Sequence, residues 1–233
     1  MKDKLELLIE FTKDEDARSR ATAIAGLAKL ADLRGFAPVL VALFDPVDEV
    51  RVTAATALGV FKDERALEPL VSCLNDPCEQ VAVNCVWALG QLPGARAARQ
   101  LVDTALDEAA SAPVRTAAVT AIGEGTQLEG NALSSDKALV QDARQALTPL
   151  MKAADDELRA TSVWTLGHFP HSDAAVDGFI DALADEYEWV VRYAIEALAN
   201  MRDARAVEPL QGLLADEREA VSQLAKQALE QLA

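Results

Sequence analysis

Apolar and polar positions along the chain repeat in a ten-residue helical pattern. The clearest copy is VRVTAATALG at 50–59, and related copies begin at Val81, Val114, Leu158 and Val190, with degenerate ones at Ala17 and Val221. The copies end at Gly26, Gly59, Gly90, Gly123, Gly167, Ala199 and Glu230, so the successive steps are 33, 31, 33, 44, 32 and 31 residues. A nearly fixed period of this length indicates an array of structural repeats.

A second motif precedes most copies and predicts a helix before each of them. It is an apolar run with a proline near its start, as at Pro38, Pro69, Pro149 and Pro209. Proline is tolerated in the first helical turn, and the Asp45-Pro46 and Asp76-Pro77 steps mark the helix end. Each unit therefore reads as helix A, a tight turn, helix B and a loop, and neighbouring units must stack to bury their apolar faces.

The predicted fold is all-α, a right-handed α-α superhelix of about seven helix-pair repeats spanning 1–233 as one array. The repeats are expected near 1–34, 35–65, 66–97, 98–136, 137–173, 174–205 and 206–233. The step of 44 residues places an insertion at Glu124–Asp136, which is rich in Gly, Ser and Asn. We expect disorder there in preference to a functional loop; a longer helix A after it, or a boundary between two subarrays, is an alternative.

Helix B has two faces when its Val is numbered 0. Positions 0, 4, 5, 7 and 8 fall on one arc at about 100° per residue, and their Val, Ala and Leu residues predict a core face. Positions 2, 3, 6 and 10 fall opposite, and in a stack whose B helices line the concave surface they would face the groove. The candidate groove residues are Asn84, Trp87, Gln91, Thr120, Trp164, His168, Trp189, Arg192, Tyr193 and Glu196.

Aromatic residues are concentrated on this predicted groove face, where exposed rings usually bind something. Small residues of the intervening repeat separate Trp87 from Trp164 and would leave a pocket between them. The alternative is that each Trp packs against the neighbouring repeat as part of the core.

The motifs resemble the HEAT repeat, and more narrowly the short HEAT-like repeat of the phycobilisome (bilin) lyase superfamily. The residues that carry this resemblance are the "EPL" of helix A, the Asp-Pro turn, the "VRxxAAxALG" of helix B and "WALG" at Trp87–Gly90. Some members of that superfamily attach, isomerise or detach a linear tetrapyrrole on a phycobiliprotein, and others are adaptors. The chain has no His-Cys signature of the kind some lyase-isomerases carry, so the resemblance implies no catalytic residue here.

The resemblance extends to two other enzyme families, which the residues exclude. Deoxyhypusine hydroxylase binds iron through His-Glu pairs, but neither His168 nor His171 precedes a Glu. HEAT-like DNA glycosylases are basic, whereas this chain has a net charge of −16 from 38 acidic and 22 basic residues. A field of that sign repels nucleic acids and anionic membranes and suits a basic partner.

The remaining candidates receive structural interpretations. Position 1 of helix B holds Arg18, Arg51, Arg115 and Arg159, and the turns hold Asp45, Asp76, Asp185 and Asp216, so ion pairs between adjacent repeats are expected. Cys85 and Cys73 should be buried, Cys78 lies in a turn, and the two histidines should be solvated. No residue spacing suggests a metal site, and no cofactor is expected.

The sequence thus predicts a binding scaffold rather than an enzyme, with a protein partner that offers a basic or apolar segment. The alternative is a bilin lyase or chaperone that binds a linear tetrapyrrole and a phycobiliprotein. A third hypothesis is that the end repeats stack between two chains. With no secretory signal and no apolar stretch of about 20 residues, a cytoplasmic location without membrane insertion is expected.

Overall fold

The computed structural model describes residues 3–127, 131–170 and 173–232, and fifteen α-helices account for most of them. Fourteen of these helices form seven consecutive A–B pairs. The pairs are α1 (Lys4–Phe11) with α2 (Ala17–Leu30), α3 (Phe36–Ala42) with α4 (Asp48–Phe61), α5 (Leu67–Ser72) with α6 (Glu79–Gln91), α7 (Ala95–Leu106) with α8 (Ala112–Gly125), α10 (Lys137–Leu147) with α11 (Asp156–Gly167), α12 (Asp173–Ala182) with α13 (Glu188–Met201), and α14 (Val207–Gly212) with α15 (Glu219–Leu232). The fifteenth, α9 (Ala132–Ser135), precedes α10.

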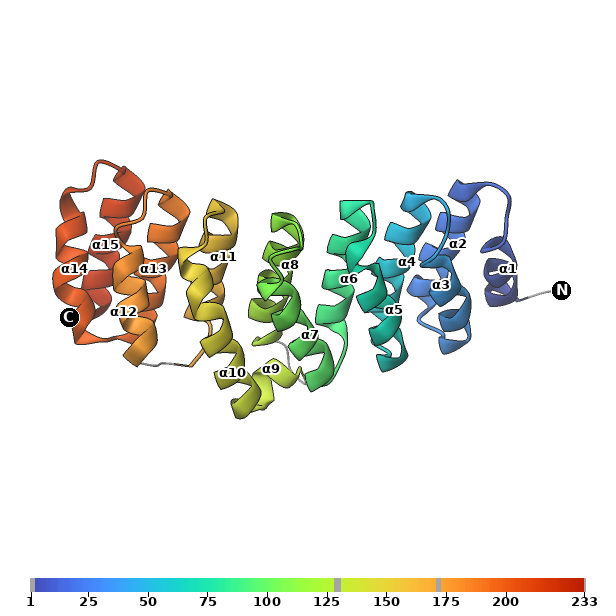
Figure 1. The fold of residues 1–233 in the computed structure, drawn as a ribbon, viewed down its shortest axis with the longest axis horizontal. Coiled ribbons are helices and arrows are strands. Elements are labelled where there is room, and N and C mark those ends of the chain that lie inside the picture. The colour runs from blue at the N-terminus through green and yellow to red at the C-terminus, as the bar shows by residue number, and fades with distance from the viewer. Residues whose placement is uncertain (1–2, 128–130, 171–172, 233) are drawn as a thin grey trace.

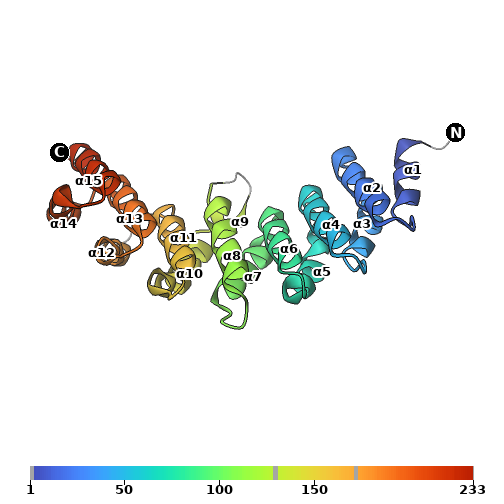
Figure 2. The ribbon, with the colours of Figure 1, turned by 90° about the horizontal axis from the view of Figure 1, so that it is seen from above.

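The pairs stack side by side into a solenoid, which confirms the predicted all-α repeat architecture. Each B helix packs against the next B helix along the chain, from α2 through α4, α6, α8, α11 and α13 to α15. The turns between helix A and helix B lie along the upper edge in Figure 1. The array is curved, and Figure 2 shows the B helices on its concave side and the A helices on its convex side.

The core follows the predicted positions of helix B. In α4 these positions hold Val50, Ala54, Ala55, Ala57 and Leu58, and all five are buried. The small alanines let neighbouring helices approach closely, while the branched residues fill the space between layers. The same five positions are buried in α6, α8, α11 and α13.

The register predicted for the first repeat is wrong by two residues. Ile24 and Leu27 of α2 are fully buried, and they match Ala55 and Leu58 of α4 at a spacing of 31. The residue equivalent to Gly59 is therefore Ala28, not Gly26. The sequence pattern aligned Gly26 with Gly59 because most of the other copies end in glycine. A Cβ added at Gly26 would meet Leu8 of α1 rather than the next B helix.

Several A helices begin in a 3-10 turn. Short 3-10 segments precede α3, α5 and α14, at Leu33–Gly35, Glu64–Ala66 and Ala204–Ala206. In each case an aspartate caps the turn through the backbone N–H of the arginine two residues on, as Asp63 does for Arg65 at 2.9 Å. A residue in the left-handed region precedes each aspartate and ends the B helix before it. In the fifth repeat Pro149 lies in a 3-10 segment, Thr148–Lys152, after a longer helix α10.

Residues 131–136 of the insertion form helix α9 and its flanking caps where disorder was expected, and residues 128–130 lie outside the described ranges. Asn131 caps α9, and its amide Nδ2 lies 3.4 Å from the Gly90 carbonyl oxygen. Leu133 is buried and lies close to Gly125 at the end of α8. The composition of the insertion did not reveal this packing, because it depends on a single buried leucine. The B helices α8 and α11 pack against each other as elsewhere in the stack, so the insertion does not interrupt the array.

Candidate binding surface on the concave face

The ten candidate residues all lie on the B helices α6, α8, α11 and α13 or directly after α11, and none of them is buried. These helices form the concave side of the solenoid (Figure 2). Trp189 is 45% exposed and Trp87 38%, and His168 and Glu196 are exposed as well. The other six, Asn84, Gln91, Thr120, Trp164, Arg192 and Tyr193, are half-buried.

Trp87 and Trp164 each rest on a glycine of the preceding B helix. A Cβ added at Gly59 would lie 2.6 Å from Cζ3 of Trp87, and one added at Gly123 would lie 2.6 Å from Cζ3 of Trp164. The glycines thus provide the space in which one edge of each ring lies. Each tryptophan therefore packs against its neighbouring repeat, as the core interpretation expects. Part of each ring also stays exposed, as the groove interpretation expects.

Aromatic and charged side chains form a cluster on α13. The rings of Trp189 and Tyr193 have their centroids 5.7 Å apart, and the Arg192 guanidinium carbon lies 4.4 Å from the Trp189 ring centroid. Arg192 also lies 3.6 Å from Glu188. Its Nε is buried and has no hydrogen-bond partner among the described residues. Stacking on Trp189 and one long ion pair therefore orient this guanidinium.

His168 is held against Trp164. The two ring centroids are 4.4 Å apart, and Nδ1 of His168 lies 2.8 Å from the Trp164 carbonyl oxygen. Because a carbonyl only accepts hydrogen bonds, Nδ1 carries the proton and Nε2 is left for another partner. His168 is exposed, as the prediction of a solvated histidine requires, but these two contacts hold its ring in one orientation. His171 lies outside the described residues.

Two notches lie between neighbouring B helices on this face. The first, of about 90 Å³, lies between α11 and α13 and is lined by Trp164, His168, Tyr193, Glu196 and Asn200 among others. The second, of about 180 Å³, lies between α13 and α15 and again includes Glu196 and Asn200. Gln227 and Gln231 of α15 complete it. Their positions, 6 and 10 of the last repeat, follow the same helical rule, which was not extended to that repeat's polar residues.

Carboxylates border this face at the turns between helix A and helix B. Each of these turns carries one to three of them, with three in the first repeat at Asp14, Glu15 and Asp16. In the sixth repeat the Tyr187 hydroxyl donates to Glu157 of the preceding repeat at 2.6 Å, and this hydrogen bond raises the pKa of Tyr187 to about 12. A segment lying in the groove would therefore meet carboxylates along one side.

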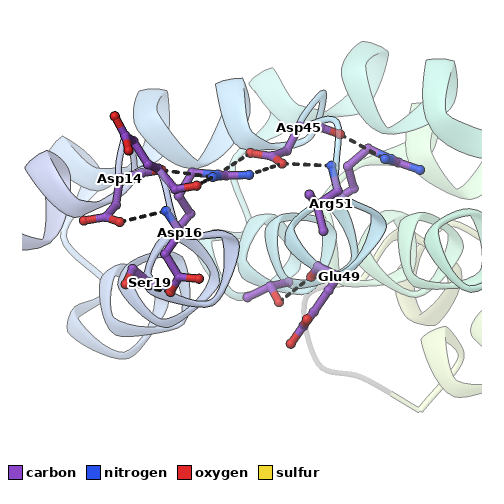
Figure 3. A network of polar contacts seen from close by, with 10 residues as sticks. Asp14, Asp16, Ser19, Asp45, Glu49 and Arg51 are labelled. Carbon is purple, nitrogen blue, oxygen red and sulfur yellow. Dashed lines mark hydrogen bonds and ion pairs between the residues drawn. The ribbon is translucent and has the colours of Figure 1, made fainter.

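Ion pairs between repeats follow the prediction in part (Figure 3). Arg51 pairs with Asp76 and Arg159 with Asp185, as expected. In the first repeat the pairing residue is Arg20, which reaches Asp45 at 2.7 Å, and not Arg18. This correction has the same cause as the register shift of α2.

Two other expected pairs are absent from the described residues for a simple reason. Arg115 donates to the Ala105 carbonyl oxygen at 3.0 Å, because the next repeat has Ala153 where the second, third, sixth and seventh repeats have Asp. Position 1 of the sixth repeat is Val191, so Asp216 pairs instead with Arg218 of its own turn at 2.8 Å.

Arg218 fills the place that an arginine at position 191 would fill. It donates to the Asp185 carbonyl oxygen at 3.2 Å and to the Asp216 carboxylate. Arg51 makes the equivalent pair of contacts, to the Asp45 carbonyl oxygen at 2.9 Å and to the Asp76 carboxylate. The contact between the sixth and seventh repeats is thus made by an arginine of the seventh repeat, whereas the other inter-repeat pairs use an arginine of the earlier repeat.

The cysteines lie where the helical pattern predicts them. Cys85 is fully buried in α6, Cys73 is 5% exposed, and Cys78 is half-buried at the start of α6. Among the described residues, no three His, Cys, Asp or Glu side chains gather as metal ligands would. No helix in the described ranges has both the length and the apolar character to cross a membrane.

Comparisons with known proteins support the same architecture. A model of HEAT repeats matches residues 37–123 and 135–230. A search of curated proteins found no match. Among solved structures, an archaeal HEAT-like repeats protein from Thermococcus onnurineus NA1 is similar over 100% of this chain and 98% of its own, with 16% identity and a TM-score of 0.66.

Two further solved structures share the fold at low sequence identity. The CpcE–CpcF complex of phycocyanin lyase from Nostoc sp. PCC7120 matches over 100% of this chain and 96% of its own, at 19% identity and a TM-score of 0.56. A designed armadillo repeat protein in complex with the peptide (KR)4 matches over 99% of this chain and 100% of its own, at 20% identity and a TM-score of 0.51. At these identities the likeness establishes the fold alone.

Proposed function

This chain belongs to the HEAT-repeat family, and from that premise we propose that it is a protein-binding scaffold whose concave face holds an extended segment of a partner. The observation that carries the proposal is the row of two notches between α11, α13 and α15. Consecutive notches between helices of a solenoid suit side chains that project from an extended peptide, because both recur along a line.

The residues around the notches fit that role. Trp164 and Tyr193 offer aromatic walls in the first notch, and rigid aromatic side chains are frequent anchors of protein interfaces. Asn200 and Gln227 have amides that both donate and accept hydrogen bonds, as a peptide backbone requires. The face therefore combines apolar contact with groups that can pair with a main chain.

Charge favours a segment that carries Lys or Arg. Glu196 lines both notches, and the carboxylates of the A–B turns border the groove. A cationic side chain in the first notch would lie beside two aromatic rings and near one carboxylate, an arrangement that stabilises ammonium and guanidinium groups. The (KR)4 peptide bound by the designed armadillo protein shows that a related architecture accepts such a segment.

The notches do not suit the tetrapyrrole alternative. At about 90 and 180 Å³, neither has room for four linked rings. The likeness to the phycocyanin lyase complex extends to the fold, so the geometry of this face favours a peptide ligand.

The proposal is tested by capture of partners from a lysate of the source cells with three immobilised proteins. These are the wild-type chain, the double variant Trp189→Ala/Glu196→Lys, and the control Phe44→Ala, which removes an exposed aromatic side chain outside the B helices. We expect the wild type and the control to retain the same protein and the double variant to lose it. Equal retention by all three proteins would contradict the proposal.

A further inference from the structure

A cavity of about 640 Å³ lies near the edge of the solenoid opposite the A–B turns. Helix α9 and the first turns of α10 form one side of it, and the residues that follow α11 form the other. In Figure 1 this region is the lower edge, where α9 and α10 are drawn. The volume falls within the range of about 300–1,000 Å³ that is usual for small-molecule sites.

The charge of the cavity is opposite to that of the chain. Its described lining includes Lys137, Arg144 and His168 and contains no carboxylate, although the chain has 38 acidic and 22 basic residues. The carboxylate of Asp136, next to Lys137 in sequence, accepts hydrogen bonds from the backbone N–H groups of Ala138 and Leu139. Among the described residues, no ion pair involves Lys137 or Arg144.

The two inner basic groups are held in place before any ligand binds. Nη1 of Arg144 donates to the Pro170 carbonyl oxygen at 3.0 Å, and Nη2 donates to Gln141. An arginine has five N–H donors, so others stay available. Nδ1 of His168 donates to the Trp164 carbonyl oxygen, so its Nε2 can donate to an anion only when the imidazole is protonated. Side chains that are already held in place lose little entropy when they bind an anion.

Apolar side chains complete the lining. Leu133 from α9 and Phe169 after α11 are both buried and reach the cavity with one side, and Val140 of α10 also lines it. A ligand that matches both parts of the cavity must combine an oxyanion with an apolar body. We propose that the cavity binds a small organic anion in which one phosphate or carboxylate group is attached to an apolar skeleton.

This site is separate from the proposed peptide-binding notches, although His168 lines both the cavity and the first notch. A ligand in the cavity would thus lie next to a residue that contacts Trp164. The inference does not depend on the scaffold function, since it rests on the charge and shape of the cavity alone.

The experiment is a calorimetric titration of the whole chain with three probes, phenyl phosphate, phenylacetate and the neutral 2-phenylethanol. We expect at least one oxyanion probe to bind saturably with one site per chain, and the neutral alcohol to bind at least about tenfold more weakly. The stronger of the two oxyanion probes identifies the head group that the cavity prefers.

Two variants and a control assign the binding to this cavity. Lys137→Gln and Arg144→Gln should each raise the dissociation constant of the preferred oxyanion about tenfold. Lys152→Gln removes a lysine from the same repeat but outside the cavity, where it pairs with Asp181, and should leave the dissociation constant unchanged. Lys137 is exposed, so its variant keeps the test valid if Arg144→Gln folds poorly.

Two results would overturn the inference. One is the absence of saturable binding of both oxyanions at millimolar concentration, or equal affinity for the neutral alcohol. The other is a Lys137→Gln variant that binds as tightly as the Lys152→Gln control.

Discussion

Arg51 of the second repeat donates two parallel hydrogen bonds of 2.8 Å to Asp76 of the third, from Nε to Oδ2 and from Nη2 to Oδ1. The two side chains are only 13% and 9% exposed. The guanidinium also donates to the Asp45 carbonyl oxygen, so one side chain joins two successive turns. Figure 3 shows Arg51 and the Asp45 turn to which it donates. Such pairs couple neighbouring repeats at the edge of the core.

Loss of this pair should destabilise the array more than loss of an exposed one. Arg51→Met leaves the Asp76 carboxylate partly buried without its partner, and we expect the free energy of unfolding in urea to fall by about 2 kcal/mol. The control is Arg96→Met, which removes a pair with Glu68 whose side chains are about three-quarters exposed. That change should cost less than about 0.5 kcal/mol. Equal losses for the two variants would contradict a coupling role for the inter-repeat pairs.

Acid should weaken the last steps of the array through Asp185 and Asp216. The hydrogen bond from Arg218 lowers the pKa of Asp216 to about 2, and Arg159 lowers the pKa of Asp185. A carboxyl group with a lowered pKa in the folded state contributes its stability above its ordinary value near 3.8, and loses it as the pH falls from there towards about 2. The urea midpoint should therefore drop across this window.

The variant Arg218→Gln checks the cause of this pH dependence. The pKa of its Asp216 should rise towards the ordinary value, although the backbone N–H of residue 218 still donates to this carboxylate, so stability should change less between the two ends of the window. Carboxyl titration of Asp216 by NMR measures the shift directly. An unchanged pKa of Asp216 in Arg218→Gln would show that the arginine is not responsible.

Glycine at 59 is required by the ring of Trp87. In Gly59→Ala the new Cβ would lie 2.6 Å from Cζ3 of Trp87 and 3.0 Å from the Ala88 Cα, so the ring or the helix must move. We expect a loss of about 1–3 kcal/mol in unfolding free energy, with a change in tryptophan fluorescence. Gly212→Ala is the matched control, because no atom lies within 4 Å of its added Cβ. A Gly59→Ala variant as stable as this control would mean that the ring does not occupy the space above the glycine.

Thiol labelling should distinguish the three cysteines. Cys78 is half-buried, whereas Cys73 and Cys85 are buried in the core of the third repeat. A maleimide reagent should therefore modify Cys78 first in the native protein, and the other two only at the rate of unfolding. Mass spectrometry of digested samples assigns the labelled sites. Labelling of Cys85 as fast as Cys78 would contradict the predicted packing of α6.

The sequence predicted the core because helix geometry alone determines it. Five positions per B helix recur with the helical period, apolar except for Ser162 and Thr165 of α11, and the structure buries them from α4 to α13. The first repeat was misaligned because Gly26 imitates the terminal glycine, and only the partners of Arg20 and Ile24 reveal the register. Local pattern identifies a helix face well, but a degenerate copy needs contacts with its neighbour to fix its position.

The candidate site was predicted less completely. The periodic rule placed Trp164, Tyr193 and Glu196 on the concave side, where the structure brings them into one notch. The cavity beside α9 could not be found in this way, because Lys137 and Arg144 lie on helix A of the same repeat as His168, and Leu133 of the insertion completes the lining. Residues that occur in a single repeat leave no periodic signal.

Hydrogen–deuterium exchange on the complex with the captured partner segment tests the central claim most directly. The claim predicts slower exchange in α11, α13 and α15, around Trp164, Tyr193 and Gln227, with the A helices α12 and α14 unchanged. Because the notches lie between B helices, protection should be strongest where Glu196 and Asn200 line both of them. Protection confined to the A helices, or spread equally over both faces, would contradict binding on the concave face.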